Sequence, residues 1–325
     1  MRKNTLRQTK FPLSLSDVFY SYFSMKRFGL PFMAICAFPL LLAFSCKPKT
    51  GNTSDTLSFD TIQVNTVHYQ DNDKTKPACN LQITFIYPQS GIPENTLHTL
   101  QTLFIETMLG VPYTSLHPKE ATDAFTRQYI NDFNDFAERE TEIESESEFE
   151  HEHEHEFEHE FESEFEFEPE EKSEYLYYLL LKNPVVYNEN DLLSFTVEKS
   201  IFEGGAHGSK SIYGYVVDLQ TGKLIDENTF AGNNYSKNLS ILISQKLASA
   251  NGLSSPDELE NIGYVNATDI VPNNNFTLDK QGITYYFNEY EIGAYFLGVT
   301  QLFIPYEELN MYIQKESLIA PVTGF

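Results

Sequence analysis

A histidine in a glycine-rich segment is the residue of this sequence most suited to acid–base chemistry. His207 lies in Gly204-Gly205-Ala206-His207-Gly208, and Glu203 and Asp218 are near it in the chain. An unperturbed imidazole titrates near physiological pH and can act as a general base. Catalysis also needs a nucleophile or an activated water, and no Ser or Cys of the sequence occupies a nucleophile-elbow setting. We therefore expect the segment to bind a ligand, through Gly204, Gly205, His207 and Gly208.

An acidic and aromatic segment is the second candidate. Glu289, Tyr290 and Glu291 lie within a Tyr-rich stretch from Tyr285 to Gly298. Paired carboxylates can act in glycoside hydrolysis, but two acids that flank a Tyr are more typical of a solvated strand edge. We expect Tyr290 to contribute to binding. A hydrolase that acts on peptidoglycan, through His207 or clustered carboxylates, is the alternative.

Metal-binding side chains are concentrated in one low-complexity run. Glu occupies every even position from Glu138 to Glu170, and imidazoles fill four of the odd positions: His151, His153, His155 and His159. Imidazoles four residues apart would align on a helix and bind Zn²⁺ or Ni²⁺. Tracts of this kind chelate metals in any case, and the composition favours a solvated, disordered insertion over residues 138–171. Metal binding is thus an alternative role of the run, and no cofactor is expected.

The same run accounts for most of the acidity of the chain. It contributes −17 to a formal net charge of −25, which leaves −8 for the remaining sequence. A mildly acidic fold without a basic patch argues against binding to nucleic acid, or to an anionic membrane surface by charge. Such a fold suits a cationic partner.

The N-terminal residues predict export and a lipid anchor. Met25-Lys26-Arg27 precedes an apolar stretch from Phe28 to Ser45, the order found in signal peptides. Ala43-Phe44-Ser45-Cys46 resembles a bacterial lipobox, so Cys46 is the predicted lipidation site, and an uncleaved membrane anchor is the alternative. The basic residues after Cys46 favour the periplasmic side. We expect a cell-envelope protein on the periplasmic face of the outer membrane, attached through lipid only.

Hydrophobic spacing predicts strands and helices on both sides of the acidic run. Only Cys79 of the three cysteines would remain after processing, so 26 Phe and 20 Tyr residues must fill the core without a disulfide. The expected strands are 61–69, 80–87, 175–181, 192–201, 211–218, 276–278, 283–287 and 301–304, and the expected helices are 97–108, 118–136 and 239–247.

Several of these motifs resemble the RsiV type of ectodomain, the type found in lysozyme-binding anti-sigma factors. The resemblance covers about 205–318 and rests on Gly204–Gly208, Thr221-Gly222-Lys223, the Tyr-rich segment and Ile304-Pro305-Tyr306. Residues 63–203 more loosely resemble the N-terminal domain of PdaC-type deacetylases. The resemblance implies an ectodomain that binds protein, specifically lysozyme. It implies no deacetylase activity, because the matched residues include no metal-dependent catalytic domain.

Together, these patterns predict an α+β fold of two mixed strand and helix modules, with antiparallel sheets and packed helices, interrupted by a disordered Glu-rich insertion. The expected order is a signal and lipobox segment at 1–46, a polar tether at 47–62, a PdaC-type domain at 63–203 and an RsiV-type domain at 204–318. The expected function is lipid-anchored binding without catalysis, with a lysozyme-like muramidase or the glycan of peptidoglycan as the ligand.

Overall fold

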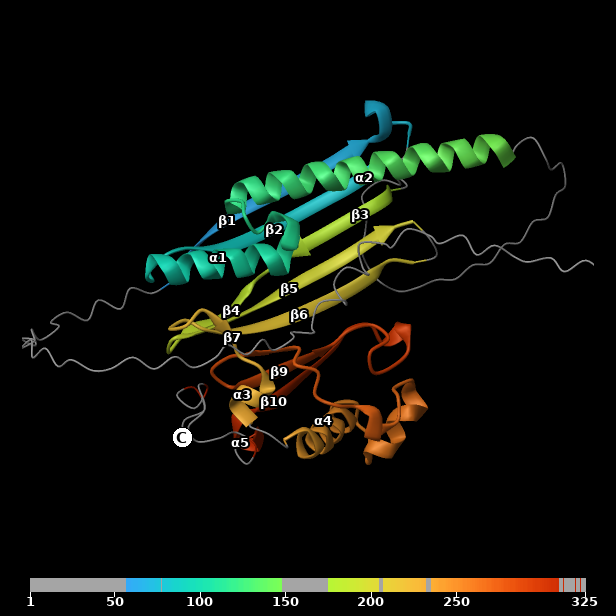
Figure 1. The fold of residues 1–325 in the computed structure, drawn as a ribbon. Helices are drawn as coiled ribbons and strands as arrows, with labels where there is room; N and C mark the ends of the chain where they lie inside the picture. Colours follow the sequence, from blue (N-terminus) through green and yellow to red (C-terminus); the bar gives the residue numbers. More distant parts are fainter. Residues whose placement is uncertain are drawn as a thin grey trace, which may run out of the picture. The chain divides into compact units, whose positions relative to one another are not determined.

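The larger sheet of this α+β protein has seven strands (Figure 1). They are β1 (Ser58–Tyr69), β2 (Ala78–Ser90), β3 (Tyr175–Lys182), β4 (Val185–Glu189), β5 (Leu192–Glu203), β6 (Ser209–Asp218) and β7 (Lys223–Leu224). Their order is β1-β2-β3-β5-β6-β7, and β4 pairs with β5. Only β2 and β3 are parallel among these pairs, because two helices carry the chain from β2 back to the start of β3. The predicted fold class is confirmed.

The computed structural model describes residues 57–76, 78–147, 175–204, 207–231 and 235–309, with 312, 319 and 322. These residues belong to one compact unit, Thr53–Phe325. No helix among them is long and apolar enough to cross a membrane, and no cluster of their acidic, His and Cys side chains is arranged to hold a metal ion. Several predicted site residues lie outside the described residues, namely Cys46, His151, His153, His155, His159 and Gly205.

Two helices cover one face of the large sheet and close a first core. α1 (Glu94–Leu109) and α2 (Pro118–Ser147) both pack on β2, as Figure 1 shows. Leu81, Ile83 and Phe85 alternate along β2 and are fully buried beneath them. Phe104 of α1 stacks on Phe195 of β5, with ring centroids 4.1 Å apart. Burial of these apolar side chains holds the helices on the sheet.

α2 is longer than its apolar stripe predicts. The stripe ends at Phe136, yet the helix continues to Ser147 and so includes the first part of the Glu run. Phe133 and Ala137 are buried and anchor the helix. Propagation of an existing helix through Glu, a good helix former, costs little. The boundary of the insertion is corrected accordingly, because residues 138–147 are helical, and residues 148–174 lie outside the described residues.

The C-terminal part of the chain forms a second sheet with its own helices. β8 (Phe276–Leu278), β9 (Gly282–Phe287) and β10 (Thr300–Pro305) are antiparallel in the order β10-β9-β8. α4 (Ser236–Ala250) packs on β10, and α5 (Tyr306–Leu309) packs on β9 and β10. A further short helix, α3 (Glu227–Ala231), buries Phe230 against Phe276.

The second core reaches the large sheet through β5 and β6. Leu192 of β5 and Val216 of β6 are buried with the side chains of the small sheet, whereas Leu193 and Val217 are buried beneath α1 and α2. Neighbouring residues of one strand thus serve opposite cores. The predicted domain boundary between residues 203 and 204 stays a prediction, and β5 and β6, which flank it, are paired in one sheet.

Gly214 of β6 makes a very close approach to the small sheet. A Cβ atom at this position would lie 2.4 Å from the carbonyl carbon and oxygen of Phe276. Asn275 fixes the crossing, because its Oδ1 accepts a 2.7 Å hydrogen bond from Gly214 N and its Nδ2 donates a 2.8 Å hydrogen bond to Ile212 O. The two backbones leave no room for a side chain.

Gly214→Ala should lower the free energy of unfolding by about 1–3 kcal/mol, because the methyl group would push two backbones apart. Urea unfolding followed by circular dichroism measures the change. Ser209→Ala, an exposed substitution in the same strand, is the control and should stay within about 0.5 kcal/mol of the wild type. A Gly214→Ala variant as stable as the wild type would contradict the close approach.

A buried carboxyl group ties α3 to the loop before β8. Glu227 is fully buried, and its Oε1 accepts a 2.9 Å hydrogen bond from Asn274 N. Its Oε2 accepts a 2.7 Å hydrogen bond from the Tyr235 hydroxyl, and its own N–H donates to Asn274 Oδ1. Burial raises the pKa of Glu227, and the hydrogen bonds from Tyr235 and Asn274 act in the opposite direction.

The raised pKa of Glu227 predicts a pH-dependent contribution to stability. The folded state holds the proton more tightly than the unfolded chain does, so this contribution is fully present below the unfolded pKa of about 4.3 and is lost as the pH rises through the folded-state pKa. The difference in unfolding free energy between wild type and Glu227→Gln should therefore decrease with rising pH. Urea unfolding at a series of pH values measures it. Tyr235→Phe removes a hydrogen bond to the carboxylate, so its unfolding free energy should depend more strongly on pH than that of the wild type. If the difference in unfolding free energy between wild type and Glu227→Gln does not change with pH, the assignment of the raised pKa to Glu227 is refuted.

Candidate functional site

The β5–β6 hairpin carries the glycine-rich segment at its turn. The strands pair up to Ile201 and Ser209, and the segment connects them. Gly204 has a φ of +84°, and a Cβ atom on it would lie 3.3 Å from the ring of Phe136 in α2. Glycine is suited to this position because the chain turns with positive φ close to the partly buried ring of Phe136.

His207 stacks on an aromatic ring from the C-terminal part of the chain. The ring centroids of His207 and Tyr295 are 4.1 Å apart, and the ring planes differ by 29°. Tyr295 begins a short 3₁₀ helix, η6 (Tyr295–Leu297), and its hydroxyl donates a 2.8 Å hydrogen bond to Gly208 O. These contacts join the glycine-rich segment to the Tyr-rich segment.

Tyr290 is the exposed end of this stack. Its ring centroid lies 5.5 Å from that of Tyr295, and the residue is 64% exposed. It has a φ of +66°, a conformation that costs a bulky L-residue on the order of 1–2 kcal/mol. Glu291 closes the turn, because its N–H donates to Asn288 O and its Oε2 accepts from Asn288 N. Backbone strain at an exposed aromatic residue points to a functional position.

Two further rings extend the aromatic surface onto the large sheet. Tyr178 of β3 and Phe202 of β5 are cross-strand neighbours whose ring centroids are 6.0 Å apart. The Tyr178 hydroxyl lies over Gly208, where a Cβ atom would come within 2.4 Å of it. We define the aromatic site as the following five residues: Tyr178, Phe202, His207, Tyr290 and Tyr295.

Glu289 places a carboxylate at the border of the aromatic site. Its Oε1 accepts a 3.0 Å hydrogen bond from Lys210 N. Partial burial raises the pKa of Glu289, while the Lys210 N–H and the nearby His207 act in the opposite direction. Burial, assisted by the Glu289 charge, raises the pKa of Tyr178. The Tyr178 hydroxyl is therefore protonated at neutral pH, and it lies near the carboxyl group of Glu289.

The structure brings together the predicted binding residues that it describes. Gly204, His207 and Gly208 lie in one connection, and Tyr290 joins them through Tyr295. The sequence reasoning missed the roles of three residues, Tyr178, Phe202 and Tyr295. Tyr295 lies in the Tyr-rich segment, but composition alone does not tell which Tyr faces the imidazole.

Asp218, near His207 in the chain, lies at the opposite end of β6. It is the last residue of that strand, about 30 Å from the turn at the rise of an extended chain. Its carboxylate accepts hydrogen bonds from Gln220 N and the Thr221 hydroxyl in the turn before β7. Asp218 therefore cannot orient the imidazole.

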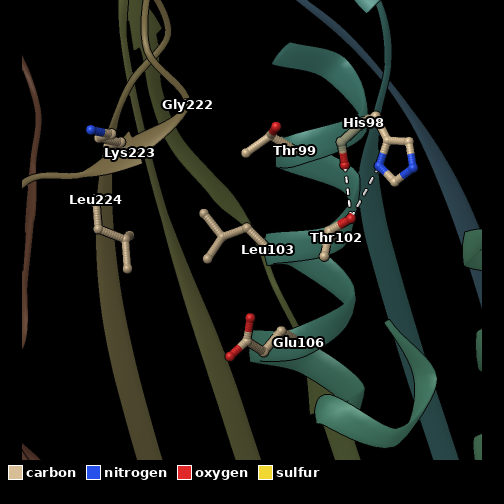
Figure 2. Close-up of a pocket in the computed structure, with 8 residues that line it drawn as sticks. All are labelled: His98, Thr99, Thr102, Leu103, Glu106, Gly222, Lys223 and Leu224. Atoms are coloured by element: carbon tan, nitrogen blue, oxygen red, sulfur yellow. Dashed lines mark hydrogen bonds between the residues drawn. The ribbon is translucent and has the colours of Figure 1, made fainter. Parts of the chain in front are cut away.

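An open groove of about 420 Å³ lies between α1 and β7 (Figure 2). Figure 2 shows Leu103 and Leu224 facing each other across it. His98 is turned to its own helix, where the Thr102 hydroxyl lies within hydrogen-bond distance of both His98 Nδ1 and His98 O. The polar groups do not converge as they do in a ligand pocket. The groove adjoins the β7 end of β6 and is separate from the aromatic site at the other end.

Comparisons with known proteins assign a family domain to the C-terminal part of the chain. Residues 225–307 match the family described as "Protein of unknown function (DUF3298)". A solved structure of a DUF3298 family member from Bacteroides fragilis is 27% identical, with a TM-score of 0.69 over 83% of this chain and 97% of that chain. A solved structure of a DUF3298 family protein from Pseudomonas aeruginosa is 14% identical and shares the fold. Its TM-score is 0.50, over 80% of this chain and 96% of that chain. No curated protein matches the chain.

The family domain contains only part of the aromatic site. Tyr290 and Tyr295 lie within the matched residues, whereas Tyr178, Phe202 and His207 precede them. The aromatic site therefore forms where the family domain meets the large sheet.

Gly208→Ala should lower the free energy of unfolding by about 1–3 kcal/mol. The added methyl group would clash with the Tyr178 hydroxyl and would lie 2.9 Å from Ile201 O. In a Tyr178→Phe background the loss should be smaller, because one clashing atom is gone, and the coupling should be about 0.5–3 kcal/mol. Urea unfolding of the four proteins measures the cycle. Strict additivity of the two substitutions would rule out the contact.

Proposed function

We propose that this chain is a non-enzymatic binding protein of the bacterial cell envelope and that the aromatic site is its binding surface. The observation that carries the proposal is Tyr290, a 64% exposed ring that is held at positive φ and stacked on Tyr295. An exposed ring contributes little to the stability of the core, so the core does not explain why Tyr290 is held at positive φ. Contact of the ring with a binding partner would explain it. Tyr is enriched among the residues that dominate protein–protein interfaces, because its ring buries a large area and its hydroxyl still bonds.

The proposed partner is a basic, lysozyme-like muramidase. The resemblance to RsiV-type ectodomains supports this choice, and so does the charge of the chain outside residues 138–171, which is −8. Glu289 and Glu291 flank the exposed ring. Attraction between an acidic and a basic protein raises the association rate, while contacts at a central ring slow dissociation.

The proposed location rests on the N-terminal residues. Cys46 is the proposed lipidation site, and the folded unit from Thr53 would follow it after a short polar tether. Stable attachment by lipid requires more than one acyl chain, which a lipidated N-terminal Cys can carry. The proposed membrane contact is this lipid alone, on the periplasmic face of the outer membrane.

Tyr290→Ala should weaken binding of lysozyme at least about tenfold, because it removes the exposed ring of the stack. Biolayer interferometry with the full chain in detergent, at physiological salt, measures the dissociation constant. Leu224→Ala is the matched control, because Leu224 is 49% exposed and lies in β7, away from the aromatic site. Equal affinities of the wild type and Tyr290→Ala would refute the assignment of the site.

The acidic run requires its own control, because polyglutamate attracts any basic protein. A variant in which a short flexible Gly/Ser linker replaces residues 148–174 retains the α2 sequence to Ser147 and removes most of the run. Its affinity for lysozyme at physiological salt should stay within about threefold of the wild type, because contacts at a desolvated ring are screened little by salt. Binding that disappears with the run or with salt would contradict a folded recognition surface.

A further inference from the structure

The strand β1 forms one edge of the large sheet. It has 12 residues and, within the described part of the chain, pairs only with β2. The strand β7, at the other end of this sheet, has only 2 residues. Edge strands of monomeric proteins are commonly short or interrupted by Pro or Lys, because a long open edge pairs readily with another strand. β1 contains neither Pro nor Lys.

The outer side of β6 shows how this chain closes an edge. Three N–H groups of β6 donate hydrogen bonds of 2.7–3.0 Å to side chains from the C-terminal part: Lys210 N to Glu289 Oε1, Ile212 N to Asn288 Oδ1 and Gly214 N to Asn275 Oδ1. These side chains take the place of a neighbouring strand. On the outer side of β1, the described residues supply no such cover from another element. The edge of β1 is therefore accessible to a further strand.

One hydrogen bond shows which backbone groups of β1 face outward. Thr61 N donates a 2.8 Å hydrogen bond to Asp60 Oδ1 and not to β2. Because alternate residues of a strand direct their N–H and C=O groups to the same side, those of Gln63, Asn65 and Val67 also point away from β2. The side chains of all these outward residues are exposed. Ile62 and Val64, between them, are half-buried on the helix side of the sheet.

The sequence of β1 matches itself when it is read in reverse about Val64. In an antiparallel pair of two copies centred on this residue, each position meets a side chain of matching class: Gln63 meets Asn65, Ile62 meets Thr66, Thr61 meets Val67, and Asp60 meets His68. Amide thus lies opposite amide, β-branched opposite β-branched, and acid opposite base, which are favourable cross-strand pairs.

Neighbouring registers lose this match. A centre at residue 63 or 65 would place Asp60 opposite Thr66 or Gln70, and would leave one amide of each strand opposite a β-branched residue. A shift that keeps Val64 opposite a residue of the other face is excluded, because it would turn Ile62 and Val64 towards exposed polar side chains. The match selects a second copy of β1, in one register, as the strand that this edge accepts.

We propose that β1 pairs in antiparallel fashion with β1 of a second copy of this chain, centred on Val64, so that two large sheets join into one. The outward backbone groups of Thr61, Gln63, Asn65 and Val67 form the ladder between the copies. Ile62 and Val64 gain burial against the second copy, which favours association. The pairing does not depend on the proposed binding function, because β1 contributes no residue to the aromatic site.

Charge exchange at Gln63 and Asn65 tests the pairing, by analytical ultracentrifugation of the full chain in density-matched detergent. Gln63→Lys/Asn65→Lys places Lys opposite Lys and should raise the dimer dissociation constant at least about tenfold, and Gln63→Glu/Asn65→Glu should do the same. An equimolar mixture of the two variants should form the dimer again, because Lys then lies opposite Glu. Gln63→Lys/Asn65→Glu places the two charges in one chain and should dimerise at least as tightly as the wild type.

The matched control is Asn238→Lys/Gln245→Lys, which adds the same charge at exposed amides of α4 and should leave the dimer unchanged. Dimer formation in the mixture also shows that both charged variants are folded. A wild type that stays monomeric up to about 100 μM would overturn the proposal. A dimer as stable in Gln63→Lys/Asn65→Lys as in the wild type would place the interface elsewhere, and a mixture no more dimeric than its components would overturn the pairing about Val64.

Discussion

The fold depends on burial of β5 and β6 from both sides. The first six residues of β5, from Leu192 to Val197, are all buried. A strand with only one buried face would alternate, so this continuous run requires a layer on each side of the sheet. α1 and α2 supply one layer and the small sheet supplies the other. The second layer comes so close that β6 has glycine at position 214 and β5 has Ser194, whose hydroxyl accepts a 3.0 Å hydrogen bond from Leu278 N.

This central position of β5 and β6 also builds the aromatic site. The turn between the two strands is the place where the helix side and the small-sheet side of the molecule can both reach the same residues. Gly204 lies close enough to α2 that a Cβ atom on it would be 3.3 Å from the Phe136 ring, while Gly208 O accepts a hydrogen bond from Tyr295 of the C-terminal part. Glycine is needed at Gly208 because Tyr178 and the backbone of β5 occupy the space of a side chain. The glycines therefore position the rings, and the rings form the surface.

Local patterns in the sequence were sufficient to predict most helices and strands, but they did not predict which of these elements contact one another. The spacing of Leu100, Phe104 and Met108 predicted α1, and Gly110 predicted its end, because helical periodicity and a C-terminal glycine are local signals. The end of α2 was missed, since Glu at alternate positions gives no periodic signal while still favouring helix. The contacts of His207 with Tyr295, and of Gly208 with Tyr178, join residues far apart in sequence and follow from the layer arrangement. Asp218 shows the opposite case. It is near His207 in the sequence, which suggested that the two side chains act together, but the extended strand β6 separates them in the structure.

The aromatic site contains residues from both layers, so binding of a ligand to this site depends on folding of both cores. Tyr178 and Phe202 belong to the large sheet, and Tyr290 and Tyr295 belong to the loops that follow β9. If either core opens, the stack loses one of its sides, so a ligand that contacts both sets of rings binds only the fully folded chain. Such a ligand stabilises both cores together, in proportion to the logarithm of its concentration over its dissociation constant.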